Sequence, residues 1–153
     1  MKHKCSSEKG TTLAGSRARI IFYTLAACIS LAGLADATYL TVQSLTGETV
    51  VCGGSASCLE VLGSVYARIA GIPVAALGTL GYFSAFSFAT FAAFGYARAR
   101  TIFSLTVWAM LAVTLWLLFV QAFLLHAFCR YCLLSAALVF TLAAVLVATP
   151  PSD

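Results

Sequence analysis

The sequence predicts an all-α membrane protein, a four-transmembrane-helix bundle, and two observations carry that prediction. Of the 153 residues, 61% are hydrophobic and only 9% are charged, a composition outside the range of soluble domains. The apolar residues also form four long runs, and one membrane-spanning helix needs about 20 apolar residues. The expected environment is therefore a lipid bilayer. The charge pattern shows no nucleic-acid footprint.

The N-terminal part predicts a polar tail followed by the first span. Residues 1–19 are polar and basic, which is typical of a disordered cytoplasmic tail. The apolar run over 20–45 is too long for the core of a signal peptide, so we expect it to be retained as a span. It contains Asp36, and an acidic residue inside a membrane is costly enough to suggest a function. The alternative is a hydrogen-bonded packing residue near Tyr39 and Thr41.

An outer loop and a half-helix are expected over residues 46–70. Gly53 and Gly54 leave the backbone between Cys52 and Cys58 free to turn, so a disulfide between these cysteines is geometrically easy. From Cys58 to about Ile69, apolar residues recur at helical spacing. This segment is too short to cross a bilayer. We predict an interfacial half-helix that covers the mouth of the bundle.

Three further spans complete the predicted domain, which covers residues 20–149. The second span, over 72–96, starts near Pro73 and is rich in small residues that allow close helix packing in lipid. A short inner loop over 97–101 leads to the third span, 102–126. The fourth span, 129–149, ends before Pro150 because proline cannot continue a helix. Residues 150–153 are expected to form a cytoplasmic end.

The distribution of basic residues predicts the orientation. Seven of the nine lysines and arginines lie in the tail or in the inner loop: Lys2, Lys4, Lys9, Arg17, Arg19, Arg98 and Arg100. Only Arg68 and Arg130 lie on the other side. The positive-inside rule therefore places both termini in the cytoplasm and both cysteine pairs outside, where disulfides persist.

Two cysteine pairs on one side of the membrane suggest a redox relay. Cys129 and Cys132 form a CxxC at the start of the last span, and a helix N-terminus favours a thiolate. Thiol-disulfide exchange with the pair Cys52 and Cys58 would carry two electrons to this site. Cys129 is expected nearer the water, for exchange with Cys58, and Cys132 one turn deeper, facing a lipid-soluble quinone. Four thiols allow three pairings, and the sequence leaves the choice open.

Other interpretations of the polar residues remain open. The bundle could be non-catalytic, with structural disulfides or a bound metal, although the wide spacing between Cys52 and Cys58 fits a zinc site poorly. Cys5 and Cys28 are expected to have no redox role, because one lies in the tail and the other is a small apolar residue in a span. His126 is either an interfacial residue or a proton donor.

The order and spacing of these motifs resemble the vitamin K epoxide reductase family, particularly its bacterial members. The resemblance rests on Cys52, on CLEVLGSVYA at 58–67, on GIPVAALG at 71–78 and on the CxxC, and it extends over about residues 35–140. It implies a four-helix bundle around a quinone, capped by a half-helix. It further implies a quinone-dependent thiol oxidoreductase in which Cys52 and Cys58 shuttle electrons to Cys129, and Cys132 contacts the quinone.

The resemblance also implies the binding partners. Besides Cys132, the residues expected near the quinone are Ser64, Tyr66, Ala75 and Gly78. The acceptor would be ubiquinone or menaquinone, with no metal. The donor would be a periplasmic thioredoxin-like, DsbA-like protein acting in trans at a bacterial inner membrane. The chain has no asparagine and carries Ala136 where animal members have tyrosine, which favours disulfide-forming quinone reduction over epoxide reduction. Oxidases of the DsbB type share this chemistry but carry their two cysteine pairs in the reverse order.

Overall fold

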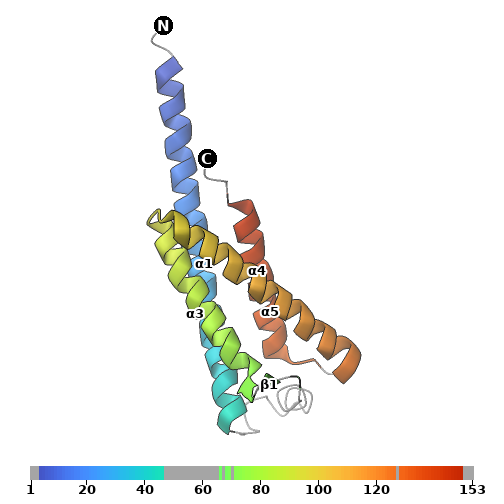
Figure 1. Ribbon diagram of the computed structural model, residues 1–153. Coiled ribbons are helices and arrows are strands. Elements are labelled where there is room, and N and C mark those ends of the chain that lie inside the picture. Colours follow the sequence, from blue (N-terminus) through green and yellow to red (C-terminus); the bar gives the residue numbers. More distant parts are fainter. Residues whose placement is uncertain (1–3, 47–65, 67, 70, 127, 150–153) are drawn as a thin grey trace.

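The fold is a bundle of four long helices, seen in the computed structural model of Figure 1, which describes residues 4–46, 66, 68–69, 71–126 and 128–149. The helical segments Ser16–Thr46, Val74–Ala93, Ala97–Leu125 and Arg130–Ala148 are each long and apolar enough to cross a membrane. The predicted fold class, a four-helix membrane bundle, is confirmed. The elements in chain order are α1 (Lys4–Thr46), β1 (Arg68–Ile69), β2 (Ile72–Pro73), α3 (Val74–Ala93), α4 (Ala97–Phe119), η2 (Val120–Leu125) and α5 (Arg130–Ala148).

Helix α1 starts earlier than expected. It begins at Lys4 and runs for 43 residues, so the prediction of a disordered tail over 1–19 is wrong for residues 4–19. No proline interrupts the chain between Lys4 and Thr46. Once a helix is nucleated, each further residue adds one backbone hydrogen bond, so the apolar span extends continuously into the polar segment before it.

The segment before α3 forms a small hairpin. Strands β1 and β2 pair antiparallel, with Arg68 opposite Pro73, and Gly71 between them has φ +83°, a conformation that glycine adopts without steric cost. The half-helix expected to reach about Ile69 therefore does not include Arg68 and Ile69. Residues 58–65 and 67 of that half-helix lie outside the described residues. The second span begins at Val74 rather than at residue 72.

A tight turn joins α3 to α4. Gly95 has φ +95°, and its backbone N–H donates to the carbonyl of Ala92 at 3.0 Å. Because this one residue reverses the chain, α4 starts at Ala97. The inner loop expected over 97–101 is helical instead. At the other end of α4, the π-helix η2 ends at His126, whose left-handed backbone (φ 50°) terminates the element.

Small residues hold α1 against α3. Ala26, Ser30 and Ala37 of α1 are buried, and at Gly33 a Cβ atom would overlap the ring of Tyr82. Close approach of this kind is how helices associate in lipid, where no hydrophobic force drives them together. Tyr82 itself is almost fully buried, with 1% of its surface exposed.

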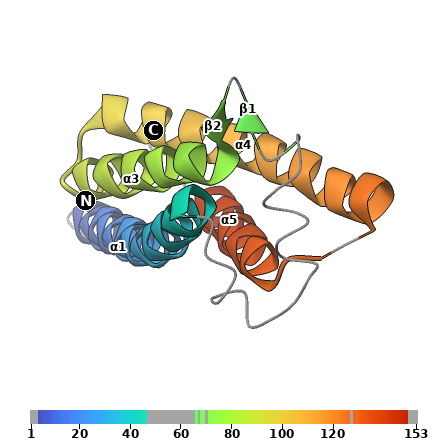
Figure 2. The same ribbon diagram turned by 90° about the horizontal axis from the view of Figure 1, so that it is seen from below.

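Helices α4 and α5 complete the bundle. Tyr23 of α1 meets Phe103 of α4 edge-to-face, with ring centroids 5.9 Å apart, and Val139 and Leu142 of α5 join the same core. Figure 2 shows α5 beside α1, and α3 between α1 and α4. In both views the η2 end of α4 extends away from α3.

Candidate active site

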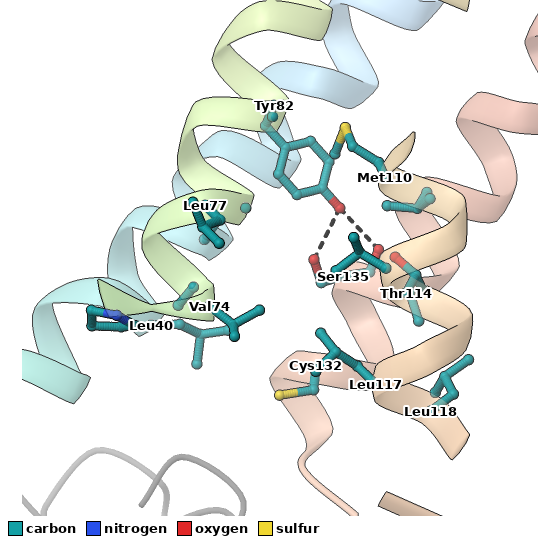
Figure 3. Close-up of a pocket in the computed structure, with 18 of the residues that line it drawn as sticks. Leu40, Val74, Leu77, Tyr82, Met110, Thr114, Leu117, Leu118, Cys132 and Ser135 are labelled. Carbon is teal, nitrogen blue, oxygen red and sulfur yellow. Dashed lines mark hydrogen bonds between the residues drawn. The ribbon is translucent and has the colours of Figure 1, made fainter. Parts of the chain in front are cut away.

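A cavity of about 420 Å³ lies between α1, α3, α4, η2 and α5. This volume is within the range of about 300–1,000 Å³ typical of small-molecule sites. Most of its wall is apolar and includes Leu40, Val74, Leu77, Val113 and Leu117, several of which Figure 3 shows around the open space. An apolar ring system would fit such a wall, and a charged ligand would not.

Cys132 forms part of the cavity wall. It lies in the first turn of α5, and its sulfur points into the space between α5 and α3 in Figure 3. Ser135, Ala136 and Val139 follow on the same cavity-lining face, as expected from the spacing of side chains on a helix. The position of Cys132 therefore follows from where α5 begins and which face it turns inward.

Cys129 lies just outside this wall, at the N-cap of α5. Its carbonyl accepts the first hydrogen bond of the helix, from the N–H of Leu133 at 3.0 Å. Its own N–H donates to Oε1 of the buried Gln121 at 3.4 Å. The Cys129 side chain is fully buried, whereas that of Cys132 is half-buried beside the cavity. The expectation that Cys129 lies nearer the water stays a prediction.

The two thiols interact directly. The Cys132 thiol donates a hydrogen bond to the Cys129 sulfur, and this lowers the pKa of Cys129 to about 6. Backbone N–H groups of Cys132 and Tyr131 act in the same direction, whereas burial and the charge of Asp36 oppose it. In the reduced pair at neutral pH, Cys129 therefore carries the negative charge and Cys132 carries the proton, an arrangement suited to thiol-disulfide exchange.

The Cys129 pKa gives a first testable prediction. We expect the thiolate absorbance of the reduced protein to rise with a midpoint near pH 6, because the thiolate exists above the pKa and is protonated below it. Cys132→Ala removes the donor, so the midpoint should move upward. Cys28→Ala, which changes an exposed cysteine elsewhere on α1, should leave the midpoint where it is. An unchanged midpoint in Cys132→Ala would contradict the assignment.

Three polar residues of the site were not predicted from the sequence. The Tyr82 hydroxyl lies 2.9 Å from both the carbonyl oxygen and Oγ of Ser135, and Figure 3 shows this link bridging α3 and α5 beside the cavity. Gln121 also lines the cavity and is buried, with 3% of its surface exposed. The feature of the sequence that could have identified them is that each is a polar side chain within a predominantly apolar segment.

The structure brings part of the predicted site together. Tyr66, Ala75, Gly78 and Cys132 all line the cavity. Cys52, Cys58 and Ser64 lie outside the described residues. His126 is exposed at the end of η2 and is not part of the cavity wall, which argues against a direct role there. Within the described ranges, no group of three or more His, Cys, Asp and Glu side chains could hold a metal ion.

The sequence matches a known family over most of its length. A family model described as the vitamin K epoxide reductase family matches residues 24–147. The matched range starts within α1 and ends next to the last residue of α5. It includes the helical residues around the cavity, the CxxC, and Cys52 and Cys58.

Proposed function

The chain belongs to the vitamin K epoxide reductase family, and on that premise we propose that it passes electrons from a thioredoxin-like protein dithiol to a membrane quinone. Family membership makes it an oxidoreductase of the membrane. What we propose beyond this is the identity of the electron donor, the identity of the electron acceptor and the route of the electrons between them. The observation that carries it is the position of Cys132, whose thiol is hydrogen-bonded to Cys129 and lines an apolar cavity.

The cavity suits a quinone. Its apolar wall would hold the ring, with Tyr66, Ala75 and Gly78 on one side and Cys132 on another. Gln121 and the linked pair of Tyr82 and Ser135 supply the polar groups at its edge; such groups orient a bound ligand. When bound, ubiquinone or menaquinone would supply an acceptor for two electrons and two protons.

The cysteines would act in sequence. A reduced donor opens the Cys52–Cys58 disulfide, and the Cys58 thiolate attacks Cys129, which breaks the Cys129–Cys132 bond and releases the Cys132 thiolate. Cys52 then attacks Cys58 and releases Cys129. Its lowered pKa makes Cys129 a good leaving thiolate. The net result is one donor disulfide formed and two electrons held by the CxxC pair, with the Cys132 thiol keeping a proton next to the cavity.

The proposed setting is a bacterial inner membrane, with both termini in the cytoplasm. Seven of nine basic residues lie on the terminal side of the bundle, which supports this orientation. The CxxC would then face a compartment in which disulfides form. A DsbA-like protein is the kind of soluble dithiol donor that such a compartment supplies.

Purified protein in lipid nanodiscs tests the proposal. We expect reduced donor and quinone to be consumed in equal amounts, since each donor dithiol yields two electrons. Cys28→Ser is the matched control and should turn over normally, because Cys28 is exposed on α1 and is not part of the cavity wall. If no quinone is reduced and all cysteines are inert to the donor, the chain is instead a non-catalytic bundle with structural disulfides or a metal.

Filling the cavity should impair quinone binding without affecting the thiols. At Gly78 a Cβ meets only Ala37, at 3.7 Å, so Gly78→Leu can be accommodated and would occupy cavity space. We expect the KM for quinone to rise at least about tenfold, since about 1.4 kcal/mol of lost binding has that effect. Donor exchange in single turnover should be unchanged.

The exposed Leu80 of the same helix provides a control for the cavity variant. Leu80→Phe enlarges a side chain that is 63% exposed and is not part of the cavity wall, so it should leave the KM for quinone unaltered. Equal KM values for wild type and Gly78→Leu would exclude this cavity as the quinone site.

A further inference from the structure

Asp36 is a half-buried acidic group that the relay described above does not use. It lies on α1, one turn before the cavity residue Leu40. Its Oδ2 atom is buried and accepts no hydrogen bond from any described residue. Thr41, an expected partner, instead donates to the carbonyl of Ala37 at 2.7 Å and lies 3.2 Å from Thr79 Oγ1. Simple hydrogen-bonded packing therefore does not account for this carboxyl group.

Asp36 lies close to the redox pair. Tyr39, on the next turn of α1, contacts Tyr131 of α5 with ring centroids 5.4 Å apart, which fixes this part of α1 beside the first turn of α5. The charge of Asp36 acts on Cys129, on Cys132 and on Tyr82. Among the described residues, the titratable groups that its charge reaches are Tyr82 of α3 and Cys129 and Cys132 at the start of α5, where Tyr131 faces Tyr39 of α1 and Arg130 is the one basic residue of that turn.

We propose that Asp36 takes up a proton when the Cys129–Cys132 disulfide is reduced and releases it when the pair is oxidised again. The inference rests on the proposed function in one respect, that the CxxC is the redox pair. Reduction by a donor dithiol breaks the Cys129–Cys132 bond and forms the donor's disulfide. Of the donor's two protons, one stays on Cys132 and the other is held by Asp36, while Cys129 remains a thiolate.

The physical reason is repulsion between two negative charges. Reduction creates a thiolate on Cys129 next to an apolar cavity, and an ionised Asp36 nearby would face it through a medium that screens charge poorly. Uncompensated charges inside a membrane bundle are also costly. Protonation of Asp36 removes this repulsion and keeps the bundle at one negative charge, the same number as in the oxidised protein with Asp36 ionised. Oxidation removes the thiolate, and Asp36 then releases its proton one turn from the cavity residue Leu40.

The pH dependence of the CxxC equilibrium tests this inference without a quinone. We would measure the midpoint potential in protein carrying Cys52→Ser and Cys58→Ser, so that the CxxC is the redox couple observed. Above pH 6, uptake of two protons changes the equilibrium constant for reduction about 100-fold per pH unit, which shifts the midpoint potential by about 60 mV per pH unit. In Asp36→Asn only the proton on Cys132 is taken up, so the equilibrium constant changes about tenfold and the midpoint potential about 30 mV per pH unit. Equal slopes in the two proteins would overturn the inference.

Two controls separate a proton site from a packing effect. Asp36→Glu keeps the carboxyl group and should retain the steeper slope. Ser30→Ala changes a buried α1 side chain whose hydroxyl has no hydrogen-bond partner among the described residues, and it should also retain the steeper slope. Infrared difference spectra of the protein with Asp36 intact give a second measurement that needs no Asp36→Asn protein. A protonated carboxyl band should appear on reduction and shift in Asp36→Glu, and its absence would overturn the inference.

Failure of this inference is distinguishable from failure of the proposed function. If the wild type shows the steep pH dependence of the midpoint potential but reduces no quinone, the proposed acceptor is wrong and the role of Asp36 stands. If the wild type reduces quinone normally but has the same pH dependence as Asp36→Asn, only the proposed role of Asp36 is wrong.

Discussion

Replacing Cys132 with alanine should abolish quinone reduction, with a loss on the order of 10³-fold or more in kcat. Of the cysteines whose side chains the structure describes, Cys132 is the one that lines the cavity, so we expect electrons to leave the protein through its sulfur. In the variant, Cys129 can still form a mixed disulfide with Cys58, but no neighbouring thiol remains to complete the transfer. The measurement is quinone reduction with a reduced thioredoxin-like donor, combined with mass spectrometry of the accumulated disulfide.

The matched control for this prediction is Cys28→Ala, which removes a cysteine from the exposed side of α1 and should leave turnover unchanged. We expect the Cys58–Cys129 disulfide to accumulate in Cys132→Ala and not in the control. Retained quinone reduction in Cys132→Ala, or a trapped disulfide at another cysteine, would show that electrons leave by a different route.

Gly33→Ala should clearly destabilise the packing of α1 against α3. A Cβ at this position would overlap the buried ring of Tyr82, and overpacking of a dense interior costs about 1–3 kcal/mol or more. Displacing the ring would also break the hydrogen bonds between its hydroxyl group and Ser135. The measurement is the midpoint of thermal or detergent-induced unfolding, which should fall clearly, together with quinone turnover.

Gly78→Ala provides the matched control, because it adds the same methyl group to the neighbouring helix in a place where the nearest atom is 3.7 Å away. Its unfolding midpoint should stay close to that of the wild type. Tyr82→Leu combined with Gly33→Ala should recover part of the lost stability, since the shorter side chain makes room for the methyl group. Similar midpoints for the two alanine variants would mean that α1 and α3 can separate at little cost.

The structure distinguishes the two cysteines of the CxxC by their protonation in the reduced pair. From the sequence, the opposing effects of burial and helix position on the thiols could not be weighed. The hydrogen bond from Cys132 decides the balance at Cys129 and lowers the pKa of its thiol to about 6. The same hydrogen bond leaves a proton on the cysteine that lines the cavity, and a quinone needs protons as well as electrons.

Element boundaries were the less predictable part of the fold. The four spans follow from their apolar length, but the helical start at Lys4 and the start of α4 at Ala97 do not. Polar residues can extend a membrane helix into water when nothing interrupts it, and a single glycine such as Gly95 can replace a longer loop. The hairpin from Arg68 to Pro73 was also missed, because two-residue strands have no periodicity to detect.

What the sequence determined by itself was the class of protein, the family, and the cysteines that would carry the chemistry, since apolar length and motif spacing are local properties of the chain. What only the tertiary structure decided was which side chains meet. Tyr82 reaches Ser135 across 53 positions of sequence, and Gln121 reaches the N–H of Cys129 from the preceding π-helix. In a membrane helix the lipid-facing and core-facing sides are similarly apolar, so hydrophobic periodicity cannot say which face turns inward. Which face turns inward is decided by the packing around Gly33 and Tyr82 and by the way α4 diverges from α3. Together these place the cavity beside Cys132.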